Sequence, residues 1–347
     1  MKKIFVLAVL SLCFTACCHI NMFEGDTENY KFEVNKQFEK TFEVGEVPIL
    51  EMIGKYSDFI ISSWDEQRID FSVKITVKGN DEKKVNERLN TINIMLKQVD
   101  NKVIAQTLLD KYPYKQFSGS ISVKYYVQVP RDVFMNLATI YGDIIVETVE
   151  KKFNVDIKYG DLIADSLLDD SHIDITYGDF DVNYAKLFNV ELTYAKGKVK
   201  QCDYINGILK YTDIDITKLS CGSLENMYSD VLIKEVDNVK FGNNQYTNID
   251  LKNVTEKLEA ALQYSNIEAM VSANEPNIEI TGQYSNLNLT LNENASFNYN
   301  LQTQYGKIKT PFVKESKGLS IGYYGNSEQT SGNINIKLQY GDIKINE

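Results

Sequence analysis

The sequence predicts an all-β protein, a parallel β-helix or β-solenoid of about 12–13 short coils, with an N-terminal β region and one amphipathic capping helix. The first observation is a tyrosine repeat with gaps of 16 to 21 residues, most of them 17 or 18. The second is the motif at most of these tyrosines, as in Tyr141-Gly142-Asp143-Ile144. A fixed period of this kind is typical of stacked coils of 17–21 residues each. The repeated residues are Tyr141, Tyr159, Tyr177, Tyr194, Tyr211, Tyr228, Tyr246, Tyr264, Tyr284, Tyr305, Tyr324 and Tyr340.

Residues 1–17 have the pattern of a lipoprotein signal peptide with its lipobox. Two lysines are followed by an apolar stretch, residues 4–14, that is too short to span a bilayer as a helix. Phe14-Thr15-Ala16-Cys17 is similar to the lipobox of bacterial lipoproteins, so Cys17 is the expected lipid attachment residue. Cys18, rather than Asp, in the next position favours the outer membrane of a Gram-negative bacterium. Ordinary secretion is the alternative.

Residues 18–40 are expected to form a tether and a first strand, and residues 41–135 an N-terminal β region. An early copy of the motif at Tyr56 predicts that the first coil lies within this region. A helix is predicted over 82–98, because Val85, Leu89, Ile92 and Leu96 would share one helical face. We expect it to cap an open end of the sheet stack, since exposed sheet edges invite aggregation. A partner-binding helix is the alternative.

Residues 136–347 are expected to form the regular solenoid. Val155 and Ile157 share strand parity with Tyr159, so the tyrosine rings are predicted to point inward as a structural spine. The small residue and the Asp or Asn that follow would turn the corner. An aromatic strip that stacks on sugar rings is the alternative interpretation. Residues 255–262 have a helix-like composition but keep phase with Tyr264, which favours a strand.

A second row falls two residues after the tyrosines. Its acidic members are Asp143, Asp161, Asp179, Asp213 and Asp230. Stacked carboxylates repel one another, so such a row is either solvated or neutralised. Corner chemistry, in which Asp bonds nearby backbone groups, is one interpretation. A calcium ion held by Asp143, Asp161 and Asp179 is the other, because hard cations take several oxygen ligands. No other cofactor and no firm metal site are predicted.

The composition argues against two classes of function. The net charge of −11 would become −13 without the two lysines of the signal, and an acidic surface disfavours nucleic-acid binding. His172 is the single histidine beyond the region of the signal, which disfavours histidine-based catalysis and histidine-rich zinc sites. The acids also form a regular row without long insertions that could build a cleft. The sequence therefore predicts a protein that is not an enzyme.

Two cysteines, Cys202 and Cys221, lie within the predicted solenoid, about one coil apart. They fall eight and ten residues after Tyr194 and Tyr211, so their positions in the coil differ. A disulfide between neighbouring coils and two buried free thiols both remain open.

Residues 129–132, Val-Pro-Arg-Asp, together with the Tyr-Gly-Asp-Ile copies, resemble the adhesin-like β-strand-repeat lipoproteins, the auto-transporter adhesin family with a head GIN domain. The resemblance covers roughly residues 40–347 and implies a parallel β-helix on the cell envelope without established catalytic residues. We therefore expect a lipid-anchored envelope protein whose solenoid is an adhesin or contacts glycans. A periplasmic scaffold or signalling partner for another envelope protein is the alternative. A polysaccharide-active β-helix enzyme is the least favoured.

Overall fold

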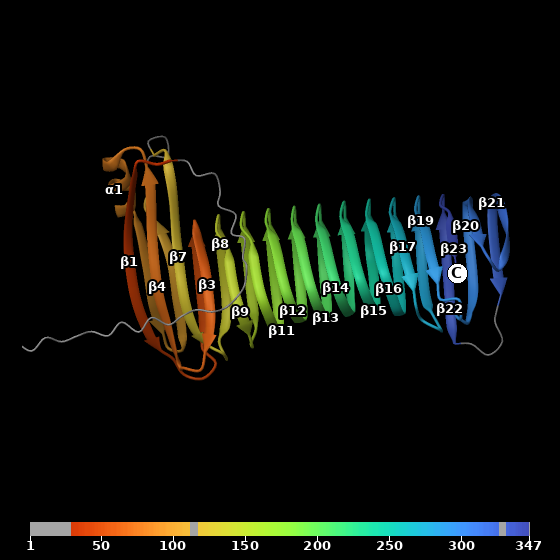
Figure 1. Cartoon of the computed structure of the whole chain (residues 1–347), viewed down its shortest axis with the longest axis horizontal. Helices are drawn as coiled ribbons and strands as arrows, with labels where there is room; N and C mark the ends of the chain where they lie inside the picture. Colours follow the sequence, from red (N-terminus) through yellow and green to blue (C-terminus); the bar gives the residue numbers. More distant parts are fainter. Residues whose placement is uncertain (1–28, 112–116, 326–330, 347) are drawn as a thin grey trace, which may run out of the picture.

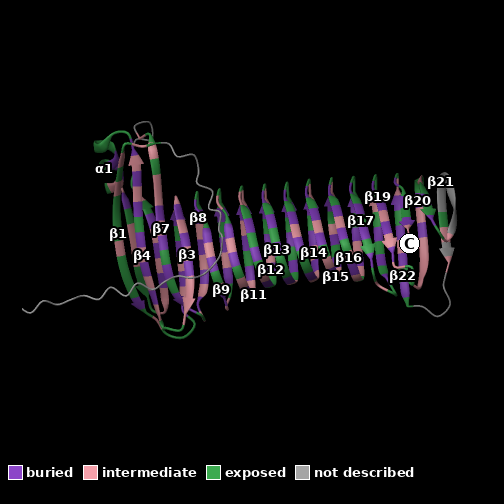
Figure 2. Ribbon diagram, viewed as in Figure 1, coloured by how far each residue is buried: buried purple, intermediate pink, exposed green. Residues whose placement is uncertain are grey.

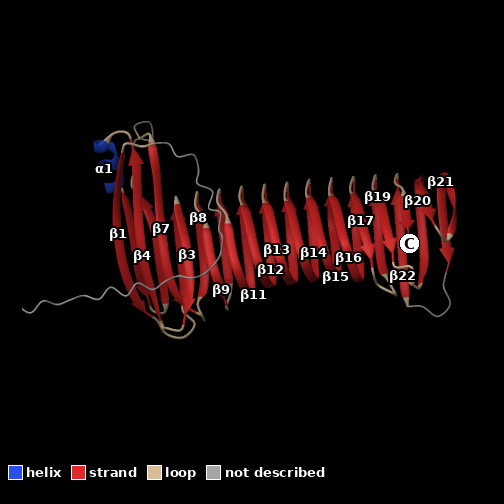
Figure 3. Cartoon of the chain, viewed as in Figure 1, coloured by secondary structure: helices blue, strands red, loops and turns tan. Residues whose placement is uncertain are grey.

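A computed structural model of the protein describes residues 29–111, 117–325 and 331–346. The expected signal peptide, its Cys17 and most of the tether therefore lie outside the described residues. Figure 1 shows coils stacked side by side along the long axis of a rod, with a wider N-terminal region at one end. Figure 3 shows that strands make up almost the whole of this rod. This architecture confirms the predicted all-β solenoid.

The N-terminal region precedes the regular coils. It contains β1 (Phe32–Glu43), β2 (Ile49–Lys55), β3 (Ser57–Trp64), β4 (Arg68–Gly79), α1 (Glu82–Asn90), β5 (Ile92–Val99), β6 (Lys102–Leu109) and β7 (Gly119–Pro130). Strands β1, β4 and β7 are antiparallel neighbours, and β7 then pairs in parallel with β3. Strands β5 and β6 form an antiparallel hairpin, and β6 pairs in parallel with β2. The region thus provides two strands, β2 and β3, with which the first regular coil pairs in parallel.

The regular coils occupy the rest of the chain. Their strands are β8 (Phe134–Ile140), β9 (Ile144–Val149), β10 (Phe153–Lys158), β11 (Leu162–Thr176), β12 (Asp179–Thr193), β13 (Lys196–Lys210), β14 (Asp213–Met227), β15 (Asp230–Gln245), β16 (Asn248–Gln263), β17 (Asn266–Val271), β18 (Asn277–Gln283), β19 (Asn286–Leu291), β20 (Phe297–Thr310), β21 (Val313–Gly325), β22 (Gly332–Gln339) and β23 (Ile343–Asn346). Strand β16 includes residues 255–262, as the repeat phase predicted.

Each strand from β11 to β16 runs from one tyrosine corner to the next and bends in between. Along β11, residues Leu162 and Ala164 are buried in the first half, and Ile173 and Ile175 in the second. Equivalent positions of successive coils pair in parallel and fill one continuous hydrophobic core, drawn in purple in Figure 2. We call the outer surface of β3, β9, the first halves of β11–β16, β17, β19 and β23 face A. Face B is the outer surface of β2, β8, β10, the second halves, β18 and β22.

The helix is shorter than predicted. It begins after Asp81, whose carboxylate accepts the backbone N–H of Lys84 at 3.2 Å, and ends at Asn90 rather than at residue 98. The Thr91 hydroxyl donates to the carbonyl of Arg88 at 2.7 Å and closes the last turn. Residues 92–99 form β5 instead, because Ile92 and Leu96 share one side of a strand as well as of a helix.

The N-terminal end of the rod is closed by β1, β5 and α1. The helix packs against β1 and β4, and its Val85 is fully buried. Lys40 of β1 donates to the carbonyl of Leu96 at 3.3 Å, and Gln98 of β5 donates to the carbonyl of Glu43 at 2.8 Å. These bonds join the outermost strands of the two faces. Among the described residues, no helix has the length and apolar character needed to cross a membrane.

The coils near the C-terminal end do not stack in chain order. Strand β22 pairs with β18 on one side and β20 on the other, and β23 lies between β19 and β20. The coil that contains Tyr340 is therefore inserted between those of Tyr284 and Tyr305. Tyr324 lies in β21, opposite Asn300 in an antiparallel pair with β20, so its inclusion among the corner tyrosines was wrong. Strand β21 covers this end of the rod (Figure 1).

Candidate binding surface

The corner tyrosines share a left-handed backbone conformation. Their φ values lie between 52° and 61° at Tyr56 and at eleven of the twelve predicted positions, all except Tyr324. Residues of L configuration rarely adopt this conformation, which costs about 1–2 kcal/mol. It reverses the alternation of side chains that an extended strand would give. The residue after the tyrosine therefore points into the core, as Thr212 and Ser285 do, both fully buried.

The tyrosine rings consequently lie outside the core, which corrects the prediction that they point inward. From Tyr141 to Tyr340, Tyr324 excepted, these side chains are 41–47% exposed. Neighbouring rings stack with centroids 4.8–5.3 Å apart and planes within 12° of parallel. Tyr56 and Tyr305 are the two ends of this stack, and every ring between them, Tyr340 included, has a neighbouring ring on both faces. The row therefore presents ring edges and hydroxyl groups to solvent, whereas stacking on a sugar needs a free ring face.

The residues that follow the tyrosines form an inner row of small side chains. In the first regular coils this residue is glycine, and a Cβ added to Gly178 would lie 1.8 Å from the carbonyl oxygen of Gly160. In the five coils from Thr212 to Ser285 it is serine or threonine, and four of these hydroxyls accept a backbone N–H from the preceding coil. Ser229 accepts from Thr212, and Ser265 accepts from Thr247, each at 3.1 Å. These bonds hold successive corners in register.

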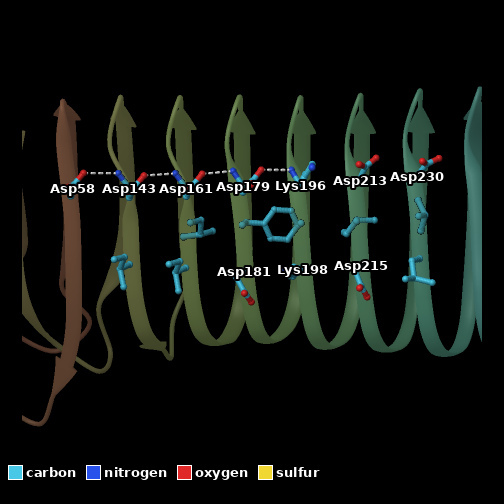
Figure 4. Close-up of a pocket in the computed structure, with 18 of the residues that line it drawn as sticks. Asp58, Asp143, Asp161, Asp179, Asp181, Lys196, Lys198, Asp213, Asp215 and Asp230 are labelled. Carbon is cyan, nitrogen blue, oxygen red and sulfur yellow. Dashed lines mark hydrogen bonds between the residues drawn. The ribbon is translucent and has the colours of Figure 1, made fainter. Parts of the chain in front are cut away.

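The residues of the next position, mostly Asp and Asn, form a row along face A, and Figure 4 shows its hydrogen-bonded part from Asp58 to Lys196. The carboxylate of Asp58 accepts the backbone N–H of Asp143 at 3.2 Å, Asp143 accepts from Asp161 at 2.9 Å, and Asp161 accepts from Asp179 at 2.7 Å. Lys196 interrupts the row, although its N–H still donates to Asp179 at 3.0 Å. The predicted acids are therefore brought together, and Asp58 of the early copy joins them.

Two carboxylates of this row bind protons more readily than a free aspartate does. Burial raises the pKa of Asp58 above its usual value, and the charge of Asp143 adds to the effect. Burial also raises the pKa of Asp161, with contributions from the charges of Asp143 and Asp179. Lys124 is the basic partner in this part of the row, with its Nζ 3.9 Å from Asp58. Within the described residues, no group of three or more His, Cys, Asp or Glu side chains is placed to hold a metal ion.

Face A is hollowed along most of its length. One groove, of about 950 Å³, extends from Asp58 and Ile60 to Asn248 and Asp250. A second, of about 850 Å³, continues from Asn248 to Lys344. Both follow the axis of the rod and cross strands that are far apart in the sequence.

Aligning the motif copies by their tyrosines identifies residues of this groove that the sequence interpretation missed. The fourth residue after the tyrosine points outward on face A in every coil. It is Ile60, Ile145 and Ile163 in three adjacent strands, and Asp181, Lys198 and Asp215 in the next three. The signal was present in the sequence, but the sequence analysis predicted an inward tyrosine and did not follow the outward residues beyond the corner.

The two cysteines of the solenoid are free thiols. Cys202 pairs with Leu219, whereas Cys221 pairs with Tyr204, so the two lie in different rows as their spacing predicted. Cys202 is buried, and this burial raises the pKa of its thiol to about 12. Neither cysteine lies on face A.

Residues 209–346 match the family Toastrack DUF4097. For this part of the chain, the match confirms the predicted resemblance to a family of adhesin-like β-strand repeats. No curated protein matches the chain.

Several solved structures match the chain at low sequence identity. One is named a putative adhesin from Parabacteroides distasonis, with 14% identity, a TM-score of 0.39, and coverage of 73% of this chain and 97% of that one. Another is named a putative lipid binding protein from the same organism, with 8% identity, a TM-score of 0.37, and coverage of 90% and 97%. A third, named a putative adhesin from Bacteroides fragilis, has 12% identity, a TM-score of 0.30, and coverage of 89% and 97%. These names describe the other proteins.

Proposed function

We propose that this chain, with its Toastrack DUF4097 match over the C-terminal coils, is a non-enzymatic, lipid-anchored protein of the Gram-negative cell envelope that contacts glycans through face A. The observation that supports this proposal is a row of asparagine side chains in the second groove, Asn248, Asn266 and Asn286, which we call the amide row. The Asn266 amide donates to Asn248 at 3.3 Å, and that of Asn286 donates to Asn266 at 3.2 Å. Each amide has two N–H groups, so one remains for a ligand hydroxyl.

A repeating polymer suits this surface because the amide row repeats over three successive coils. One sugar hydroxyl gains little from one amide, since the net value of a hydrogen bond in water is about 1 kcal/mol. Several contacts on one chain add up, because the first holds the others close to their partners. An extended glycan laid along the rod is therefore favoured over a single sugar.

The test is binding of the full-length mature protein to a glycan array, followed by calorimetry with oligosaccharides of increasing length. We expect affinity to rise with length until the row is filled. Asn248→Asp with Asn266→Asp keeps the acceptor oxygens, removes the donors and should weaken binding at least tenfold. Asp143→Asn with Asp161→Asn, at the far end of face A, is the matched control. Affinity independent of length, or no glycan bound, would refute the proposal.

Anchoring and location need their own experiments. Incorporation of labelled palmitate that is lost in Cys17→Ala would support the anchor, and unlabelled wild-type protein would contradict it. Protease treatment of intact cells tests exposure on the outer surface. Calcium stays a prediction for the row of Asp143, Asp161 and Asp179, and an unchanged melting temperature in millimolar calcium would remove it.

A further inference from the structure

An apolar row crosses the N-terminal part of face A and continues onto β7, the strand that pairs with β3. It consists of Tyr126 of β7, Ile60 of β3, Ile145 of β9 and Ile163 of β11, which are direct neighbours across paired strands. The Tyr126 side chain is 47% exposed, and the three isoleucines are partly exposed. All four point away from the core and contribute nothing to the hydrophobic cluster inside the coils. A contiguous exposed apolar row of this kind is typical of an interaction surface.

Carboxylates flank the apolar row on both sides. Asp58, Asp143, Asp161 and Asp179 lie along one side, two residues earlier in their strands. Glu147 and Asp165 lie along the other side, two residues later, and both are exposed. Among these acids, Asp58 is the one with an ion pair to another described residue, Lys124. Burial is the largest cause of the raised pKa values of Asp58 and Asp161, and the charges of neighbouring carboxylates add to it.

Lysines limit this patch at its two ends. On the N-terminal side, Lys74 of β4 lies opposite Lys124 of β7 in the paired strands. Lys196 and Lys198 occupy the two rows on the other side, beyond Asp179 and Asp181. A cationic partner would be attracted to the four strands between these lysines, β3, β9, β11 and β12, and repelled beyond them. The patch therefore specifies the charge, the length and the position of its partner.

We propose that this patch docks a basic amphipathic α-helix of a partner protein, lying along the axis of the rod. An α-helix returns to the same face every 5.4 Å, close to the spacing of 5.0–5.3 Å between the successive tyrosine rings of these coils. Its apolar residues at positions i, i+3, i+4 and i+7 would cover the apolar row. Four strands span roughly 15 Å, or about three turns and ten residues.

The width of the patch fits the same partner. At β9 and β11 the acids of the two sides are four residues apart, Asp143 to Glu147 and Asp161 to Asp165, which is roughly 13 Å at 3.3 Å per residue. A helix with its side chains is about 10–12 Å across, so lysine or arginine on its two flanks reaches both rows. An extended peptide fits less well, because its side chains repeat on one face at about 6.8 Å and lose register within four coils.

The probe is a synthetic peptide of about 14 residues with leucine on one helical face and lysine on both flanks. Its binding to the full-length mature protein is followed by fluorescence anisotropy, and its helicity by circular dichroism. A peptide of the same composition in scrambled order, and one with glutamate in place of lysine, are the peptide controls. We expect the amphipathic peptide to bind at least tenfold more tightly than either control and to become helical on binding.

Two protein variants separate the two components of the patch. Asp143→Asn with Asp161→Asn removes charge but keeps the oxygens that accept backbone N–H groups, as Asn266 does natively in the same row. Ile145→Ser with Ile163→Ser removes the apolar contact from partly exposed positions. Each double variant should weaken binding at least tenfold, whereas Asp213→Asn with Asp230→Asn, on the same row beyond Lys196, should not.

Equal binding of the scrambled peptide would overturn the proposal, because it would indicate attraction by charge alone. Binding that is unaffected by the isoleucine variant, or binding of the amphipathic peptide without helix formation, would overturn it as well. These outcomes are independent of glycan binding, which is tested with variants of Asn248 and Asn266 at the other end of face A.

Discussion

Substitution of Tyr177 separates the two opposing contributions of the exposed tyrosine row to stability. Its ring stacks on those of Tyr159 and Tyr194, each with centroids 5.0 Å apart, while its backbone has a φ of 60°. Two aromatic contacts are worth about 1–3 kcal/mol together. The left-handed backbone costs a non-glycine residue about 1–2 kcal/mol. Tyr177→Ala loses the ring contacts and keeps the backbone cost, whereas Tyr177→Gly also removes the cost.

We therefore expect Tyr177→Gly to be more stable than Tyr177→Ala. The relief of about 1–2 kcal/mol is partly offset by the greater freedom of glycine in the unfolded chain, about 0.4–1 kcal/mol. The net advantage of glycine is roughly 0.5–1 kcal/mol. At Thr176, an ordinary strand residue next to it, the order should reverse, with glycine less stable than alanine by about 0.5–1 kcal/mol. Tyr177→Phe keeps the ring and should remain within about 0.5 kcal/mol of wild type.

Urea denaturation followed by circular dichroism measures these differences as shifts in the midpoint at constant slope. The comparison of the two sites is the internal control, because both lie in the same coil. If glycine is no better than alanine at position 177 while Thr176 shows the usual order, the assigned backbone cost is wrong.

Three further substitutions test the corner rows and the buried thiol. Gly160→Ala should lower the free energy of unfolding by about 1–3 kcal/mol, because its Cβ would lie 2.0 Å from the carbonyl oxygen of Gly142; an unchanged melting temperature would contradict this. Asp161→Asn should melt above wild type at pH 7, and the difference should shrink towards pH 4. The raised pKa of Asp161 makes the folded protein take up a proton before the unfolded chain does, so wild type gains stability as the pH falls; a constant difference would refute this. Iodoacetamide at pH 8 should label Cys221 ahead of Cys202, whose burial raises its thiol pKa to about 12; peptide mapping that finds equal rates, or a linked pair, would disprove the assignment.

The period of the tyrosines predicted the coil length and the parallel stacking, because both follow from regular spacing along the chain. The direction of the rings was not predictable from strand parity, which assumes an extended backbone up to the tyrosine and beyond it. A single left-handed residue reverses that parity. A hint was available in Thr212, Ser229 and Ser265, where small residues recur after the tyrosine. A crowded corner inside the core requires small side chains, whereas a turn that is open to solvent does not.

The pairing of strands that are far apart in the sequence was the other feature that could not be predicted. Tyr284, Tyr305 and Tyr340 carry similar motifs, and such local similarity does not determine which copies become neighbours. The end of the helix was easier to predict, since Thr91 combines a β-branched side chain with a hydroxyl that can close the last turn. The apolar row at Ile60, Ile145 and Ile163 required only the correct assignment of the outward residues.

The inserted coil of β22 and β23 has a consequence for biosynthesis. Coils up to β19 can add one after another as the chain leaves the ribosome, since each pairs with a strand already made. Strand β20 has to wait, because its parallel neighbours β22 and β23 are translated after it. Premature pairing of β20 with β18 would occupy the place that β22 takes in the finished rod. Residues 332–346 therefore complete the rod by inserting between strands that were translated before them. A chain truncated before residue 332 would lack the coil that joins β18 and β19 to β20.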